Sequence, residues 1–181
     1  MAVATLSEAA AQNPDIAVRK AQIEDMLDRG RWGEAYEALV AIERDIDPIA
    51  NRHDLEWVEY EKVRASAELG KAEAEQLMCA YIEDYPSSID VVFMLASFYA
   101  DNGDVASAEQ VFSEVDYKAL DGRERERYDM RLGYIRFLEE DYPRAKTHLA
   151  KVSKQSAYYP HALYYMSYMN YKDGELERAA E

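Results

Sequence analysis

The chain has 181 residues, of which 49% are hydrophobic, so it is long enough to bury a substantial core. Its 36 acidic residues outnumber its 21 basic ones and give a formal net charge of −15, which argues against nucleic acid or an anionic membrane surface as a partner. A protein or peptide partner that is neutral or basic fits this charge better than an acidic one. With 7 Gly and 5 Pro the chain is also poor in turn residues, which disfavours an all-β fold.

The first 15 residues are expected to form an N-terminal tail. This segment has no basic start and no long apolar block, so it is not a complete signal peptide, and a remnant of an export signal or an added segment are the two alternatives. No apolar run reaches the roughly 20 residues that cross a bilayer, so direct membrane insertion is not expected. The single cysteine, Cys79, makes neither an intramolecular disulfide nor a metal motif, and leaves a periplasmic, cell-envelope or cytoplasmic location open.

From residue 16 onward one pattern recurs along the chain. A Gly or an acidic turn is followed by an aromatic or apolar residue, then by Ala, and four residues later by a large apolar side chain. In the first copy these residues are Gly30, Trp32, Ala35 and Leu39. The Ala anchors of the five copies are at positions 35, 74, 108, 145 and 179, which are 39, 34, 37 and 34 residues apart. A period near 34 predicts antiparallel helix pairs, in which the small Ala lets the two helices cross closely.

The first helices of the copies also resemble one another. Leu95, Ala96 and Tyr99 precede the turn of the third copy, and Leu132 and Gly133 precede the turn of the fourth. These residues resemble the Leu-Gly-x-x-Tyr core of the tetratricopeptide repeat family. The tyrosine-rich later copies resemble the long arrays of its bacterial members, many of which are associated with the cell envelope. The resemblance implies an all-α fold, a right-handed α-solenoid of about four and a half antiparallel helix pairs.

We expect the repeat array to cover residues 16–181. Its copies are expected at about 16–49, 54–87, 89–121, 125–158 and 160–181, and the second copy departs most from the pattern. The last copy is incomplete, because its second helix has only begun at Glu181. We therefore expect the chain to be a piece of a longer protein, and its uncapped C-terminal edge to allow a homodimer.

The resemblance further implies a groove for a partner. In tetratricopeptide arrays the first helices line the concave face, and counting from the Ala anchors places a helical stripe of apolar residues there. The predicted groove residues are Phe93, Met130, Tyr134, Phe137, Tyr164, Tyr168 and Tyr171. The alternative is that these side chains pack against neighbouring helices, as aromatic stripes commonly do. Solvent exposure of Phe93, Tyr134 and Tyr168 distinguishes the two interpretations.

The matching positions of the first two copies hold charged residues, namely Lys20, Glu24, Asp28, Glu56 and Glu59. Because Glu24 stands where the chaperone-tail-binding members of the family have Asn, the clamp for a peptide carboxylate is absent. No catalytic motif is present, and no cofactor or metal is expected. The histidines His53, His148 and His161 form no metal-binding motif with one another.

These observations predict a non-catalytic scaffold for protein–protein interaction. Two other functions stay open. One is a structural or self-assembly module of a bacterial cell-envelope protein, and the other is a regulatory repeat region of a larger enzyme. All three share the helical-repeat fold and differ in what the array contacts.

Overall fold

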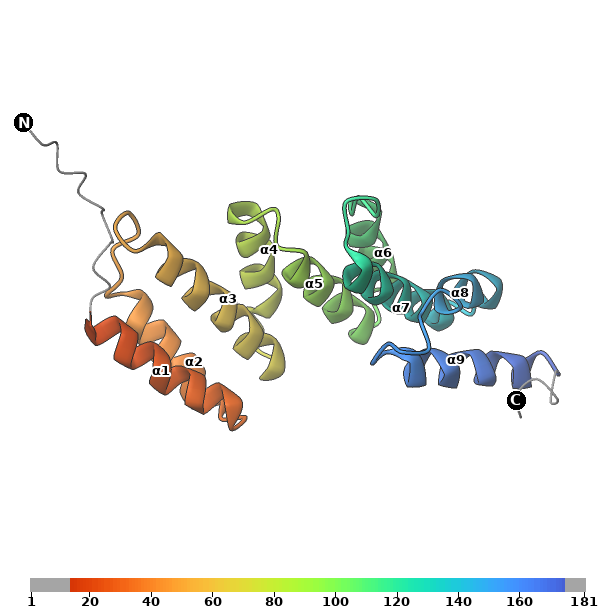
Figure 1. Cartoon of the computed structure of the whole chain (residues 1–181), viewed down its shortest axis with the longest axis horizontal. Coiled ribbons are helices and arrows are strands. Elements are labelled where there is room, and N and C mark those ends of the chain that lie inside the picture. Colours follow the sequence, from red (N-terminus) through yellow and green to blue (C-terminus); the bar gives the residue numbers. More distant parts are fainter. Residues whose placement is uncertain (1–13, 175–181) are drawn as a thin grey trace, which may run out of the picture. The chain divides into compact units, whose positions relative to one another are not determined.

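The computed structural model describes residues 14–174, and all regular secondary structure within this range is α-helical (Figure 1). The helices are α1 (Pro14–Asp28), α2 (Trp32–Glu43), α3 (Arg52–Glu68), α4 (Ala74–Asp84), α5 (Ile89–Asp101), α6 (Val105–Ser113), α7 (Gly122–Leu138), α8 (Tyr142–Leu149) and α9 (Tyr159–Lys172). Residues 1–13 of the expected tail lie outside the described residues, and Pro14 and Asp15 form the start of α1. The second helix of the last copy, with Ala179 and the expected dimer edge, also lies outside them.

The helices form two compact units, α1 to α4 and α5 to α9, which divide between Tyr85 and Pro86. In the first unit each helix packs on the next one along the chain. In the second unit α5 and α6 both pack on α7, α7 packs on α8, and α9 packs on both α7 and α8. No helix within residues 14–174 is long and apolar enough to cross a membrane.

The Ala anchors of the sequence pattern lie at the helix crossings. Four of them have no exposed surface, namely Ala35, Ala74, Ala108 and Ala145. The apolar residues four positions later are buried as well, namely Leu39, Met78, Phe112 and Leu149. Since residues four apart lie on one side of a helix, each second helix turns one small and one large side chain toward its neighbours. The predicted packing role of these positions is confirmed.

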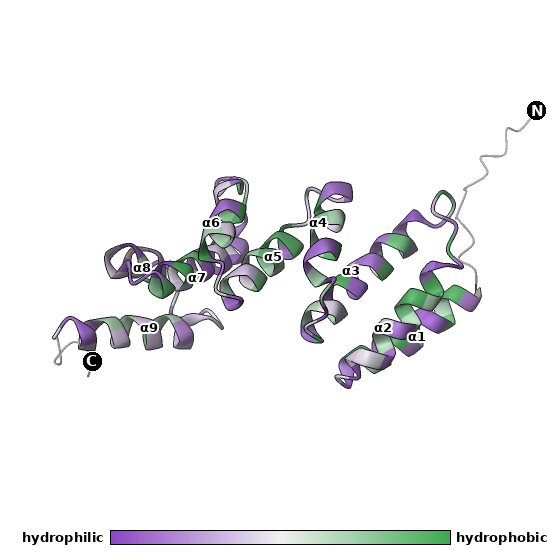
Figure 2. Cartoon of the chain, turned by 180° about the vertical axis from the view of Figure 1, so that it is seen from behind, coloured by the Kyte–Doolittle hydropathy of each residue, from purple (hydrophilic) through white to green (hydrophobic). Residues whose placement is uncertain are grey.

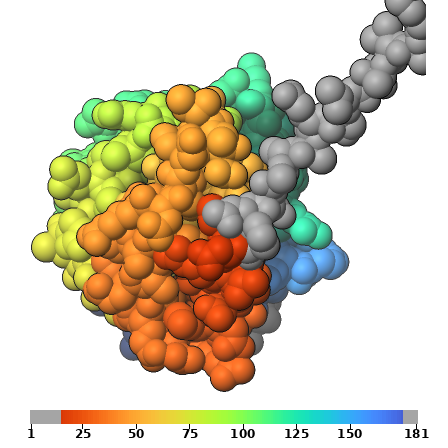
Figure 3. All heavy atoms as spheres, turned by 90° about the vertical axis from the view of Figure 1, so that its left-hand side faces the viewer, coloured from red at the N-terminus to blue at the C-terminus, as the bar shows by residue number. Residues whose placement is uncertain are grey.

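Each unit has its own apolar core. In the second unit α5 is apolar along most of its length (Figure 2), because it is covered by both α6 and α7. In the first unit Ile23 of α1, Leu39 and Ile42 of α2 and Val58 of α3 form one buried cluster. Figure 3 faces this unit from the end where α1 and α2 lie side by side.

The first helices α1, α3, α5 and α7 end in the same backbone turn. At the end of α1 the N–H of Gly30 donates to the carbonyl of Leu27, and the N–H of Arg31 donates to the carbonyl of Met26, which is the Schellman arrangement. The residue at this point must adopt a left-handed conformation. The glycines that do so are Gly30, Gly70, Gly103 and Gly174, with φ of 68°, 60°, 80° and 75°.

At the turn between α7 and α8 the left-handed position is held by Glu140, with φ of 60°. A residue with a side chain loses about 1–2 kcal/mol of folding free energy in this conformation. Gly avoids that loss, but its greater conformational freedom in the unfolded state offsets part of the gain. We expect Glu140→Gly to raise the free energy of unfolding by about 0.5–1 kcal/mol, measured by urea denaturation. The matched control is Gly103→Ala, which is expected to lower it by roughly 1 kcal/mol. A Glu140→Gly variant less stable than the parent would contradict this account.

Candidate partner-binding surface

Three of the predicted groove residues form an exposed stripe on α9. Tyr164, Tyr168 and Tyr171 expose 65%, 37% and 59% of their surface. Ala162 and Met169 on the same helix are fully buried and fix the side of α9 that faces the core. Because the three tyrosines are spaced four and three residues apart, they share one side of α9. This side differs from the buried one and faces solvent.

Two predicted groove residues of α7, Tyr134 and Phe137, are half-buried and lie against α9. Both rings contact Tyr165, with centroid distances of 5.3 and 4.8 Å. Phe137 also meets Tyr168 edge-on at 5.4 Å, and Tyr164 meets Tyr165 at 5.3 Å. These five side chains form a continuous surface of rings across α7 and α9, which we call the aromatic ladder. The rings pack on one another and still present edges to solvent.

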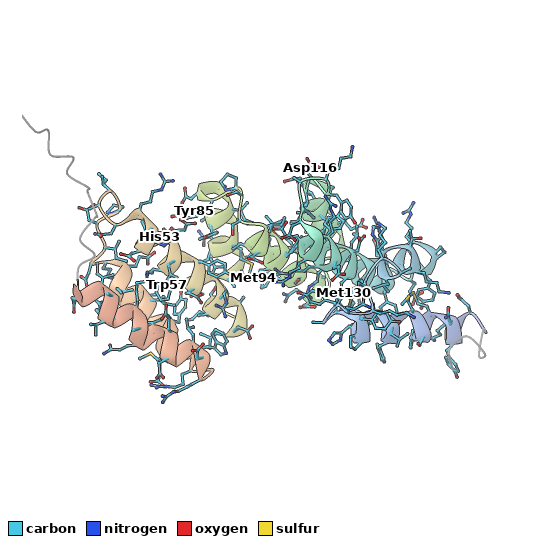
Figure 4. All side chains as sticks on the ribbon, viewed as in Figure 1. His53, Trp57, Tyr85, Met94, Asp116 and Met130 are labelled. Carbon is cyan, nitrogen blue, oxygen red and sulfur yellow. The ribbon has the colours of Figure 1, made fainter. Side chains whose placement is uncertain are left out.

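A cavity of about 340 Å³ opens beside the aromatic ladder. It lies between α5, α7 and α9, which are the first helices of three successive pairs. Its lining residues are Asp101, Met130, Arg131, Tyr134, Tyr158, His161 and Tyr165. Met130, labelled in Figure 4, is 8% exposed and packs in the core cluster with Ala145 and Leu149, so this part of the wall is held by the core.

Two opposite charges flank the phenols of the cavity. Asp101 is exposed and Arg131 is half-buried. Neither of these two side chains makes a hydrogen bond or ion pair with any residue from 14 to 174. Burial raises the pKa of Tyr134, Asp101 raises it further, and Arg131 opposes them. Burial likewise raises the pKa of Tyr165, with the same two charges acting in the same directions. Both phenols therefore keep their proton at neutral pH and can donate hydrogen bonds.

Phe93 does not belong to this surface. It is 1% exposed and stacks on Phe112 with a centroid distance of 5.7 Å, and the guanidinium of Arg127 lies 5.0 Å from its ring centroid. The prediction that Phe93 is solvent-accessible is wrong. The reason is that α6 and α7 both cover α5, so the helix side chosen by counting from the Ala anchor is a core side.

Sequence reasoning missed five residues of the cavity, namely Asp101, Arg131, Tyr158, His161 and Tyr165. Tyr165 is the centre of the aromatic ladder. Its signal was present, because His161, Tyr165 and Tyr168 follow the spacing of one helix side as well as Tyr164, Tyr168 and Tyr171 do. A search for aromatic stripes does not detect the two charged residues, Asp101 and Arg131.

Two of the charged positions of the first unit, Lys20 and Glu59, are engaged within that unit. The ammonium of Lys20 donates to Asp54 at 2.7 Å and lies 4.7 Å from the ring centroid of Trp57, which Figure 4 labels on α3. Glu59 accepts a hydrogen bond of 2.8 Å from the hydroxyl of Tyr85. Cavities of about 170 and 80 Å³ open here, both smaller than the one beside the aromatic ladder. Across the described residues no three His, Cys, Asp or Glu side chains are placed to hold a metal ion.

No family model matches the chain, and no curated protein matches it significantly. A solved structure of similar fold is the apo form of the quorum sensor NprR from B. thuringiensis, with a TM-score of 0.75 and 17% sequence identity. The match covers 92% of this chain and 51% of that chain, so the chain spans about half the length of that protein chain. At this identity the likeness is one of fold. The chain has the all-α, tetratricopeptide-like helical-repeat fold that its sequence predicts.

Proposed function

We propose that this chain is a non-catalytic scaffold that binds a segment of a partner protein, or a peptide, across α5, α7 and α9. The observation that carries the proposal is the aromatic ladder beside a cavity of about 340 Å³. Tyrosine and phenylalanine rings bury a large area for little loss of rotamer freedom. The cavity volume is at the lower end of the range found for ligand sites.

The charge of the chain supports a neutral or basic partner. At a net charge of −15 the chain repels an acidic segment during approach and attracts a basic one. This long-range effect acts on the rate of association and weakens as salt is added. It adds to the contacts of the aromatic ladder, which are short-range and insensitive to salt.

The test is selection from a displayed library of random peptides, followed by titration of the selected peptides into the full chain. We expect the double variant Tyr164→Ala with Tyr168→Ala to weaken binding at least about tenfold, which corresponds to about 1.4 kcal/mol. The control is Ile49→Ala, which removes an apolar side chain that is 93% exposed in the α2–α3 loop. Peptides that bind both variants equally would contradict a site on the aromatic ladder.

Self-association is a second candidate function. Leu163 is 43% exposed next to Tyr164 on α9, and Tyr171 is 59% exposed about two turns further on, so apolar surface collects along this helix. Contiguous apolar surface of this kind marks interfaces. Sedimentation velocity over a range of protein concentrations distinguishes the two candidates, because only self-association makes the sedimenting species grow with concentration and shrink in the Leu163→Ser variant.

A further inference from the structure

We infer that the cavity between α5, α7 and α9 selects a tyrosine side chain from the partner segment. This inference rests on the proposed function and names the partner residue that the cavity would bind. It follows from three properties of the cavity wall: its balanced charge, its aromatic and thioether surface, and its unpaired polar groups.

The charges of the wall favour a neutral occupant. Asp101 of α5 and Arg131 of α7 line the same cavity, and both act on the phenols of Tyr134 and Tyr165. Their side chains do not pair with each other in the described structure. A bound Lys or Arg side chain would be attracted by Asp101 and repelled by Arg131, and a bound Asp or Glu side chain would feel the reverse. Because the two effects oppose each other, a charged side chain would lose hydration without a compensating net attraction, whereas an uncharged side chain avoids that cost.

The remaining wall favours an aromatic ring. The rings of Tyr134 and Tyr165 lie 5.3 Å apart between centroids, with 38° between their planes, so they offer ring surface to a third ring. Met130 adds a thioether, which contacts aromatic rings favourably. The wall is already fixed before a ligand arrives, because Met130 is packed in the core and Tyr165 is held by the aromatic ladder.

The polar groups of the wall favour a hydroxyl at the tip of that ring. A phenol donates one hydrogen bond and accepts others, so a single hydroxyl can donate to the carboxylate of Asp101 and accept from the guanidinium of Arg131. A phenylalanine in the same place would strip water from both charged groups and give them no partner. Sites built to hydrogen-bond a hydroxyl reject the analogue that lacks it.

The negative charge of Asp101 is unfavourable for the stability of the fold. It is the last residue of α5, where the helix dipole is negative, and its side chain has no compensating partner from residue 14 to residue 174. Removing its charge is therefore expected to leave stability unchanged or slightly raised. A loss of binding in a variant of equal or greater stability separates a role in recognition from a role in folding.

The experiment follows methionine methyl groups by NMR in the full chain while amino-acid amides are added. The probes are N-acetyl-tyrosinamide, N-acetyl-phenylalaninamide, N-acetyl-argininamide and N-acetyl-glutamic acid amide. We expect the tyrosine probe to shift the Met130 methyl signal in a saturable way, at a concentration at least about tenfold below that of the other three. Met26, which lines a cavity between α1 and α2, provides the control signal and is expected to stay in place.

Two variants complete the test. Asp101→Asn and Arg131→Gln are each expected to reduce the preference for the tyrosine probe over the phenylalanine probe at least about threefold, without loss of stability. Equal shifts of Met130 by the tyrosine and phenylalanine probes, or a stronger response to either charged probe, would overturn the inference. Library peptides that bind the aromatic ladder and leave the Met130 signal unmoved would also overturn it, while leaving the proposed function standing. A Met130 response to the tyrosine probe with no peptide bound at the ladder would instead contradict the proposed function.

Discussion

Gly133→Ala is expected to lower the free energy of unfolding by about 2 kcal/mol. A Cβ atom at position 133 of α7 would lie 2.7 Å from Cγ and 2.8 Å from Cδ2 of Leu149 on α8. Leu149 has no exposed surface, so its side chain cannot move aside into solvent. Overpacking of this kind costs about 1–3 kcal/mol, and the better helix propensity of Ala returns less than about 1 kcal/mol.

A double-mutant cycle tests the contact itself, with unfolding in urea followed by circular dichroism. Leu149→Ala alone is expected to cost about 2–5 kcal/mol, because it leaves a cavity. In that background a Cβ at position 133 no longer meets Cγ and Cδ2 of residue 149, and only the backbone nitrogen at 3.3 Å stays close, so Gly133→Ala is expected to cost far less than in the parent. Gly122→Ala is the control on the same helix, because nothing lies within 4 Å of a Cβ there. An equal loss from Gly133→Ala in both backgrounds would refute the clash.

Asp129→Ala is expected to lower the free energy of unfolding by about 3 kcal/mol. This carboxylate of α7 is 1% exposed. It accepts hydrogen bonds from the hydroxyl of Tyr117 at 2.7 Å, from Nδ1 of His148 at 2.7 Å and from the ammonium of Lys151 at 3.0 Å. The cluster ties the loop before α7 and the end of α8 to one buried group. His148 and Lys151 reach solvent and can rehydrate, which keeps the loss at the lower end of the range for a broken buried ion pair.

The pH dependence of this loss has a definite sign. Burial raises the pKa of Asp129, but the hydrogen bonds from His148, Tyr117 and Lys151 together outweigh burial and hold the pKa below the ordinary value of 3.8. A carboxyl whose pKa is lowered by folding stabilises the protein above its unfolded pKa and loses that contribution as pH falls through the folded pKa. The stability difference between the parent and Asp129→Asn is therefore expected to shrink below pH 3.8. A difference that grows in acid would contradict the account.

The helix pairs could be predicted from the sequence because they obey local rules. A turn residue, an Ala four or five positions later and a large apolar residue four further on are close in the chain, so their period is visible. The exception is Glu140, which occupies a position where the other turns have Gly. Nothing in its residue type signals the left-handed conformation, because a side chain such as that of Glu seldom adopts it.

The candidate site could be predicted only in part, because its residues come from three helices. Asp101, Arg131 and His161 stand 30 residues apart, and only the packing of α5, α7 and α9 places them around one cavity. Phe93 and Tyr164 both belong to the apolar stripes predicted to line the groove, yet their side chains are 1% and 65% exposed. Periodicity identifies the side of a helix, whereas the neighbours of that helix decide whether the side is covered.

The placement of the aromatic residues has an optical consequence. Both tryptophans of the sequence, Trp32 and Trp57, belong to the first unit, and each lies beneath a cation, Arg64 or Lys20. Excitation at the red edge of protein absorption, where tryptophan absorbs and tyrosine does not, therefore reports on the first unit alone, whereas the aromatic ladder and its cavity contain no tryptophan. A change of tryptophan emission when a ligand binds at α9 would therefore show that binding alters the first unit, without any attached dye.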